Sequence, residues 1–341
     1  MDKFIRCFPV DALINSDTSG GVDALFARWV LPGEEAGAHG LRLAIRNGYL
    51  NFYVKGQSVG ELRMVNSQPR LKIHTKYAKN VVKGSKPEIP VGQTYQTLDA
   101  DKLRAIGHGV VEGWISTAET YAGDEKRFVD DLVAVTPGVV DLEMGLPADA
   151  GSQREDRVAP RMDLVVAQVT EIAFWEAKCA TNGELRAVAP YEEDAAGRYV
   201  RGPHVVKQLR RYQRWMEGAG RERQVSEAYV ETARLLLELA ERFEKGGPAI
   251  EAWRALKEAG DDAKVVRAPG VVVAGYCPPR ADGMLREKET NASKDRLASF
   301  SKHKDELDRR GITVHVVSEK LGSSVLPQLK IGTVITPEPR I

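Results

Sequence analysis

The first ninety or so residues alternate polar and apolar positions in a way that is typical of β-strands. The alternating or apolar runs cover 41–46, 49–55, 58–64 and 70–74. Asn47-Gly48 joins the first two runs and predicts a hairpin, because a type I′ turn needs positive φ at both central positions. Prolines and glycines interrupt 83–97, which indicates a linker. These patterns predict a β-rich N-terminal module over residues 1–95, which would serve recognition or partner binding.

The rest of the chain alternates helical and strand patterns. Helices are expected at 100–121, 124–134, 203–217, 222–245 and 293–310, with a short one ending near 260. Strands are expected at 139–146, 161–167, 170–178, 271–273 and 312–317, and a loop at 147–160. The helix from 203 is the clearest, because its apolar residues recur at the spacing of a buried stripe. We therefore expect an α/β unit over 96–341, with a helical insertion at about 222–260.

Composition and charge narrow the classes of protein. The chain has 49 Lys and Arg against 48 Asp and Glu, which argues against a protein that binds polyanions over its whole surface. Its three cysteines lie far apart and form no zinc or iron–sulfur pattern. No apolar run reaches the length of a membrane span, so we expect no membrane partner. The first residues lack the apolar core of a secretory signal, and the cytoplasm is the expected compartment.

Two stretches nevertheless concentrate positive charge without any acid. The first contains Arg70, Lys72, Lys76, Lys79, Lys83 and Lys86. The second contains Arg198, Arg201, Lys207, Arg210, Arg211 and Arg214. Such runs are often solvated faces, and for the first stretch that interpretation and a binding surface are equally open. The second stretch overlaps the helix from 203, whose charged residues project away from its apolar stripe.

The candidate chemistry lies in the two strands at 161–167 and 170–178. Side chains alternate along a strand, so Glu176 and Lys178 share one face, while Ala177 offers its carbonyl between them. A hairpin would bring Asp163 to the same face. Carboxylate and carbonyl oxygens are the ligands that Mg²⁺ or Mn²⁺ prefers. A nearby lysine can act on an attacking water and on the charge of a phosphate.

These residues, with the helix that follows, resemble the PD-(D/E)XK nuclease superfamily, and most closely its RecB-like branch. The motifs are Arg161-Met162-Asp163, then Glu176-Ala177-Lys178, then Gln208-Leu209-Arg210-Arg211-Tyr212 as the Q-x-x-x-Y helix. By motif the resemblance covers about 124–215, and it reaches 317 if the last strands complete the sheet. The chain departs from the pattern in having Met162 where proline is usual. It also lacks the four-cysteine cluster and the P-loop of some relatives.

The resemblance implies a restriction-endonuclease-like mixed sheet and Mg²⁺-dependent hydrolysis of DNA, with DNA preferred over RNA and endonuclease over exonuclease action. Asp163, Glu176 and Ala177 would hold the metal, and Lys178 would serve the water. Gln208 and Tyr212 would border the site, although Tyr212 also fits a core position. Phosphate contacts are expected from Lys207, Arg210, Arg211 and Arg214.

Several alternatives stay open. The family often adds an acid from the helix before the first strand; Glu125 is the preferred match, and Glu143 competes with it. A catalytically silent nucleic-acid-binding or regulatory subunit with the same fold is the alternative function. A role in defence against foreign DNA would suit a nuclease without a helicase. A protein partner or a second copy of the chain is also compatible with the sequence.

Overall fold

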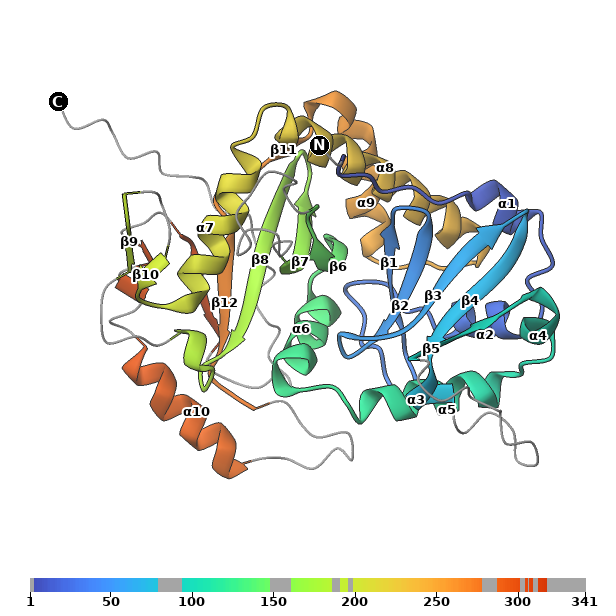
Figure 1. Cartoon of the computed structure of the whole chain (residues 1–341), viewed down its shortest axis with the longest axis horizontal. Coiled ribbons are helices and arrows are strands. Elements are labelled where there is room, and N and C mark those ends of the chain that lie inside the picture. The colour runs from blue at the N-terminus through green and yellow to red at the C-terminus, as the bar shows by residue number, and fades with distance from the viewer. Residues whose placement is uncertain are drawn as a thin grey trace.

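The protein is mixed α/β and contains an antiparallel sheet beside a mixed sheet flanked by helices (Figure 1). The computed structural model describes residues 3–78, 94–147, 161–185, 191–195, 199–277, 287–300, 304–305, 307–308 and 312–317. Most of the predicted linker at 83–97 and of the predicted loop at 147–160 lies outside these ranges. Among the described residues, no helix is long and apolar enough to cross a membrane.

The N-terminal sheet has five antiparallel strands in sequence order. They are β1 (Arg42–Arg46), β2 (Tyr49–Val54), β3 (Gln57–Val65), β4 (Gln68–His74) and β5 (Tyr95–Leu98). The predicted hairpin is confirmed, because β1 and β2 pair with Arg46 opposite Tyr49. Gly48 has a φ of 79°, but Asn47 does not adopt a positive φ, so the turn is not the predicted type I′.

Helices that the sequence did not predict pack against this sheet. They include α1 (Val10–Ile14), α2 (Gly21–Ala27) and α3 (Thr75–Ala78). The predicted helix 100–121 is two helices, α4 (Ala100–Arg104) and α5 (His108–Glu119), and these contact β4 and β3 respectively. The predicted boundary between residues 95 and 96 falls inside β5. Elements that cover the N-terminal sheet therefore continue past that boundary to Glu119.

The second sheet is mixed and has the order β13-β12-β8-β7-β6. Its strands are β6 (Val139–Gly145), β7 (Arg161–Gln168), β8 (Glu171–Cys179), β12 (Gly270–Ala274) and β13 (Val314–Val317), and the short β11 (Lys264–Val265) also pairs with β8. The strands β6, β7 and β8 form an antiparallel meander, whereas β12 runs parallel to β8 and to β13. All five predicted strands are present in this sheet.

Helices cover both faces of the mixed sheet. On one face, α6 (Asp124–Val135) packs against Trp175, and on the other, α7 (His204–Met216) and α8 (Arg221–Arg242) pack against Phe174. The remaining elements are the ribbon β9 (Glu192–Glu193) and β10 (Tyr199–Arg201), with α9 (Ala249–Ala259) and α10 (Glu287–Ser299). The helix α10 begins at Glu287, six residues before the predicted 293. The sequence did not indicate this start, because the first turns are polar and carry no apolar stripe.

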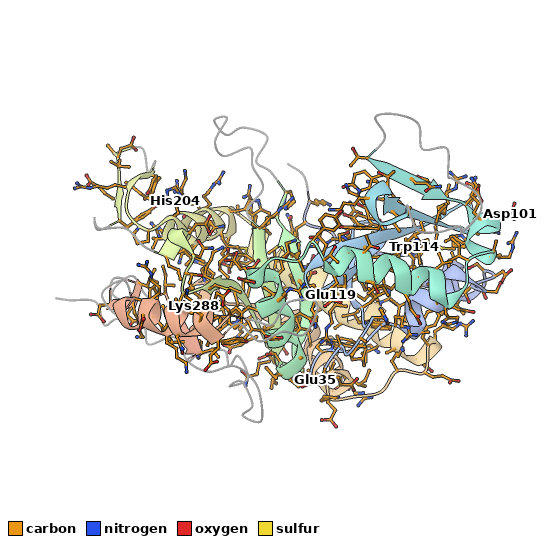
Figure 2. All side chains as sticks on the ribbon, turned by 90° about the horizontal axis from the view of Figure 1, so that it is seen from below. Glu35, Asp101, Trp114, Glu119, His204 and Lys288 are labelled. Carbon is orange, nitrogen blue, oxygen red and sulfur yellow. The ribbon has the colours of Figure 1, made fainter. Side chains whose placement is uncertain are left out.

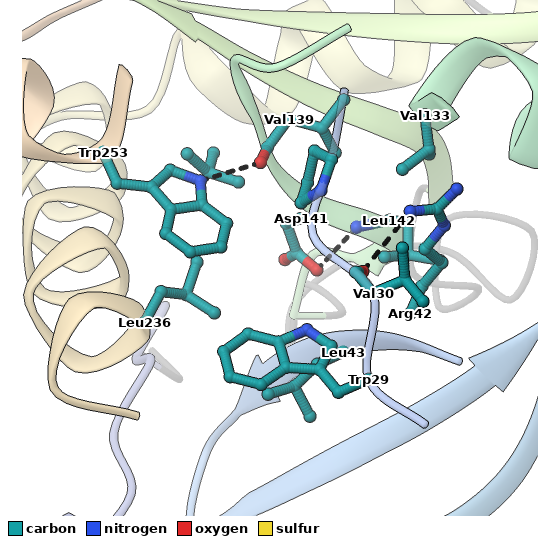
Figure 3. Close-up of a pocket in the computed structure, with 12 residues that line it drawn as sticks. Trp29, Val30, Arg42, Leu43, Val133, Val139, Asp141, Leu142, Leu236 and Trp253 are labelled. Carbon is teal, nitrogen blue, oxygen red and sulfur yellow. Dashed lines mark hydrogen bonds between the residues drawn. The ribbon is translucent and has the colours of Figure 1, made fainter. Parts of the chain in front are cut away.

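One apolar core runs between the N-terminal sheet and the helices α8 and α9. Phe26 of α2 stacks on Phe243 with the ring centroids 3.6 Å apart, and Trp29 lies parallel to Trp253 at 6.4 Å. Figure 3 shows the two indoles on either side of a small cavity, with Trp253 donating to the carbonyl of Val139 at 3.0 Å. The cavity measures about 10 Å³, which is the space of one water molecule. The packing leaves little unfilled volume there.

A buried carboxylate joins three parts of the chain. Asp141 of β6 is fully buried and accepts hydrogen bonds from Arg6 at 3.1 and 3.2 Å, from the Tyr229 hydroxyl of α8 at 3.1 Å, and from Arg46 of β1. Burial alone would lower the pKa of Arg46, but the Asp141 carboxylate beside it raises that pKa. The N-terminal segment, the first strand and α8 are thus tied to the mixed sheet by charge.

A second buried carboxylate repeats the connection on α6. Asp130 accepts from the Nε of Arg42 at 3.1 Å and from the Nζ of Lys55 at 2.9 Å. Burial acts to raise the pKa of Asp130, and the two cations together hold it below its ordinary value. Both cations come from the N-terminal sheet, so this sheet is fixed against α6 as well as β6.

We predict that Asp141→Ala lowers the free energy of unfolding by about 3–5 kcal/mol, because it leaves buried guanidinium groups without their carboxylate. Urea denaturation measures the change. The matched control is Glu238→Ala, which removes an exposed partner of Arg234 on α8 and should cost no more than about 1 kcal/mol. A similar small loss for both variants would contradict the structural role of Asp141.

Candidate active site

The candidate site lies where two strands stop pairing. β7 and β8 form the predicted hairpin, with pairs that run from Gln168 and Glu171 to Leu164 and Trp175. Beyond that pair, Asp163 accepts the N–H of Ala177 through its carboxylate, with Oδ2 at 2.8 Å from the nitrogen. A side chain therefore occupies the place where a backbone carbonyl would continue the ladder. The backbone pairing of the two strands therefore stops at this point.

Register places the predicted charged residues on one face. Leu164 and Trp175 are opposite each other and point toward α6, so Asp163 and Glu176 both lie on the other face, with Lys178 two residues further along β8. The residues Glu176 and Lys178 are each only 3% exposed. A buried charge is costly unless it is paired, so their contacts decide what the site can do.

Lys178 is held by three carboxylates. Its Nζ lies 2.7 Å from Oε1 of Glu176, 3.1 Å from Oε2 of Glu184 and 3.2 Å from Oε1 of Glu125. Glu125 comes from the first turn of α6, and Glu184 comes from a short 3-10 turn, Gly183–Leu185, that follows β8. The structure thus brings together Glu125, Asp163, Glu176 and Lys178, four of the residues singled out from the sequence.

Two residues of this cluster were not predicted. Glu184 pairs with Lys178, and Asn182 donates to Oε2 of Glu125 at 2.6 Å while its Oδ1 accepts the N–H of Glu184 at 2.8 Å. Both lie in the turn that ends β8, where no hydrophobic period exists to orient a side chain. Their closeness in sequence to Lys178 was the only available signal.

The electrostatics of the cluster are set by burial and by crowding of acids. Burial raises the pKa of Asp163 well above its ordinary value, and Glu176 raises it further, whereas Lys178 opposes both. Burial also raises the pKa of Glu176 to about 7, against the opposing effect of Lys178. The neighbouring carboxylates keep Lys178 protonated, because their effect on its pKa outweighs the lowering caused by burial.

Glu143, the competing candidate for the additional acid, takes a different position. It lies on β6 between residues that pair with Leu164 and Met162, and its φ is 50°, a conformation that L-residues rarely adopt. Its Oε1 is 3.7 Å from the Nζ of Lys126. Glu143 raises the pKa of Asp163, but Glu125 is the acid that contacts Lys178.

The two residues of the Q-x-x-x-Y motif lie one turn apart on α7. Tyr212 is fully buried, and its ring centroid is 4.7 Å from that of Phe174, two residues before Glu176 on β8. This position agrees with a core role. The Tyr212 hydroxyl and the Oε1 of Gln208 are buried and have no hydrogen-bond partner within the part of the chain that the structure describes.

The basic residues of α7 are partly neutralised by the adjoining ribbon. Arg214 lies 3.1 Å and Arg210 lies 4.0 Å from Oε1 of Glu193, and Lys207 lies over the ring of Tyr199 at 5.0 Å. Arg211 occupies the same helix and is half-buried. A phosphate that contacts these arginines would therefore compete with Glu193.

The residues fit a hard divalent cation. Oε2 of Glu176 is buried with no hydrogen-bond partner among the described residues, and Asp163 uses Oδ2 for Ala177. The carbonyl of Ala177 leaves the strand on the same edge as its N–H, toward Asp163. Within the described ranges no three His, Cys, Asp or Glu side chains form a ready metal site. Two carboxylates and a carbonyl suit Mg²⁺, which commonly completes its shell with water and phosphate.

No protein-family model, curated protein or solved structure matches the chain. The function of the protein is therefore inferred from the geometry of the site and the order of the elements.

We predict that stability depends on pH through Glu176. Its pKa rises from 4.5 to about 7 on folding, so the folded state holds this proton more tightly. That contribution is full below pH 4.5 and is lost as the pH rises to 7, on the order of 3 kcal/mol at about 1.4 kcal/mol per unit. Glu176→Gln should lack this loss, whereas Glu171→Gln, an exposed change on the same strand, should retain it. Denaturation at pH 5, 6, 7 and 8 measures it, and parallel curves for wild type and Glu176→Gln would contradict it.

Proposed function

We propose that the protein is a metal-dependent nuclease that hydrolyses phosphodiester bonds in DNA. The observation that carries this proposal is the meeting of Asp163, Glu176 and Lys178 on one face, at the point where β7 and β8 stop pairing. An ion pair alone would need neither the interrupted pairing nor the second carboxylate. The same residues would bind a cation and present its bound water to a phosphate.

The order of elements supports the same proposal. A helix, an antiparallel meander of three strands, a helix and a parallel strand follow one another as α6, β6, β7, β8, α7 and β12. Short elements are inserted after β8, and the helices α8 and α9 with the short β11 are inserted after α7. The resemblance stated from the motifs predicts such a restriction-endonuclease-like arrangement. Motif and topology were independent observations, and their agreement favours a nuclease over a chance Glu-x-Lys tripeptide.

In this mechanism Asp163, Glu176 and the carbonyl of Ala177 would hold Mg²⁺ or Mn²⁺. The bound ion would supply a Lewis acid for a phosphate oxygen and lower the pKa of a bound water. Lys178 is protonated, so it acts as a hydrogen-bond donor and positive charge rather than as the base. Glu125, held by Asn182, fixes the position of the ammonium group. Burial around Glu176 excludes bulk water and strengthens each of these interactions.

The expected substrate contacts come from α7. Its arginines are exposed enough to exchange Glu193 for phosphate, and phosphate contacts carry most of the affinity of proteins for nucleic acids. DNA is preferred over RNA, and endonuclease over exonuclease action, on the resemblance alone. Defence against foreign DNA is the corresponding biological role. Gln208 would border the substrate, since its buried Oε1 lacks a partner among the described residues.

The alternative function is a silent nucleic-acid-binding subunit. The pairing of Lys178 with three carboxylates is the observation that favours it, because the pairing stabilises the site without a metal. Against it stands the cost of keeping several acids around one cation. Incubation with single-stranded, linear duplex and circular duplex DNA, with Mg²⁺ or with chelator, separates the two functions.

We predict that Asp163→Asn and Glu176→Gln each reduce Mg²⁺-dependent cleavage at least about 100-fold, because each removes charge from the oxygens that would hold the ion. Both variants should also bind Mn²⁺ more weakly in titration calorimetry. Glu171→Gln, at the exposed start of β8, serves as the matched control and should cleave normally. Full cleavage by both site variants would exclude this site as the catalytic centre.

We also predict that neutralising Arg210 and Arg214 weakens the binding of duplex DNA of any sequence. The slope of log affinity against log salt should flatten by about 0.9 for each phosphate contact that is lost. Fluorescence anisotropy at several salt concentrations, in the Glu176→Gln background, measures both effects. Glu193→Gln should strengthen binding, because it removes the carboxylate that competes for these arginines. Unchanged slopes would place the duplex elsewhere.

A further inference from the structure

Within the described part of the chain, one face of the N-terminal sheet carries polar and partly exposed side chains on β3, β4 and β5. Leu62, Leu71 and Ile73 are buried on its inner face, against the core shared with α2 and α8. In Figure 1 no labelled helix passes in front of β2, β3 and β4 on the opposite side. This outer face consists of alternate residues of β2 to β5, and Tyr49, Arg63, Arg70, Lys72 and Tyr95 define it here.

Aromatic rings and cations alternate across the outer face. The Arg63 guanidinium lies over the ring of Tyr49 at 4.1 Å, and the Lys72 ammonium lies over the ring of Tyr95 at 4.2 Å. Arg70 of β4 lies opposite Arg63 of β3, and its side chain is exposed. Tyr95 is 47% exposed, which is unusual for so large a ring.

Acids are fewer than cations on this surface. A carboxylate oxygen of Glu61 lies 3.4 Å from Arg63 and another lies 3.5 Å from the Nζ of Lys72; the two cations are exposed and Glu61 is partly buried. Arg70 acts on Asp99 only at longer range. The local charge is therefore positive, although the whole chain is almost neutral. A partner with repeated negative charge and flat apolar groups fits this combination.

We propose that the outer face binds single-stranded DNA, with bases stacked on Tyr49 and Tyr95 and phosphates held by Arg63, Arg70 and Lys72. That the bound strand is DNA rather than RNA rests on the proposed function. Proteins that bind single strands combine a cationic surface with aromatic side chains in this way. A duplex fits less well, because its bases are already stacked and offer no free face to either ring.

A base can stack on Tyr49 or Tyr95 only if the cation over that ring moves away. The strengths of the two contacts favour this exchange. An exposed cation–π contact is worth about 2- to 5-fold in an equilibrium constant. Stacking a base on an aromatic side chain is worth about 5- to 150-fold. A base that displaces Lys72 from Tyr95 therefore gains more than is lost, and the released ammonium becomes free to contact a phosphate. In the free protein, the two rings thus hold the cations close to where the phosphates of a bound strand would lie.

One end of the N-terminal sheet contacts α6, the helix that also carries Glu125. At the turn between β2 and β3, the carbonyl of Gly56 accepts from the Nζ of Lys126 on α6 at 2.9 Å. The preceding residue of α6 is Glu125, which contacts Lys178. The N-terminal sheet and the candidate active site therefore both contact the first turn of α6. Figure 2 shows α5, which bears Trp114 and Glu119, running along the N-terminal sheet when seen from below.

The test uses the full chain with Glu176→Gln and no divalent cation, so that binding is measured without cleavage. A fluorescein-labelled 20-nucleotide oligothymidine is titrated by anisotropy. Tyr95→Ala should weaken its binding about 5- to 150-fold, and Tyr95→Phe should restore it, because phenylalanine keeps the ring. Arg70→Ala should flatten the salt slope by about 0.7. Arg254→Ala, an exposed change on α9, is the charge control and should have no effect.

Binding of a 20-base-pair duplex should be insensitive to Tyr95→Ala. Equal losses for duplex and single strand, or full affinity for oligothymidine in both Tyr95→Ala and Tyr49→Ala, would overturn the proposal. Tighter binding of oligouridine would overturn the choice of DNA. The outcome is separable from the proposed function, since ring-dependent binding by a wild type that cleaves nothing keeps this inference and removes the nuclease. Conversely, if the protein cleaves DNA but its binding of oligothymidine does not depend on the two rings, the nuclease proposal stands and this inference is overturned.

Discussion

The burial of Asp141 constrains the molecule more than any other contact. A carboxylate with no exposed surface must be paired, and its partners come from the N-terminal segment, from β1 and from α8. Because these partners are fixed in direction, the N-terminal sheet has one position against the mixed sheet. Asp130 fixes the same sheet against α6 through Arg42 and Lys55. The N-terminal sheet is thereby held against α6, the helix whose Glu125 contacts Lys178.

The hairpin of β7 and β8 and the cluster at its end were predictable because they are local. Strand alternation and a short connection place Asp163 and Glu176 on one face, and the observed register agrees. The helix α7 was equally predictable, because its apolar stripe has a period. The same stripe explains why Tyr212 is core, which the motif alone did not decide.

What could not be predicted depends on single residues without a period. The role of Asp141 needs partners distant in sequence, and nothing in its surroundings distinguishes it from a surface acid. Helices α1 and α2 have five and seven residues, too short for a helical stripe to emerge from a β-rich background. Glu184 and Asn182 lie in a turn, where orientation follows from tertiary packing. The boundary placed at 95 divided β5, since prolines and glycines at 83–97 indicated a linker and concealed a strand that returns to the sheet.

The excess of acids over cations at the site helps to explain why two of its carboxyl groups have raised pKa values. Asp163 and the three carboxylates around Lys178 would carry four negative charges against one positive charge if all were ionised. Burial and the crowding of acids raise the pKa of both Asp163 and Glu176. In the absence of a metal ion, the folded protein therefore relieves the repulsion by binding protons on these groups. On the proposed function, a divalent ion would relieve the same repulsion without a proton. Protons and the ion would then compete for the same oxygens, and binding of the ion would weaken as the pH falls and Glu176 gains its proton.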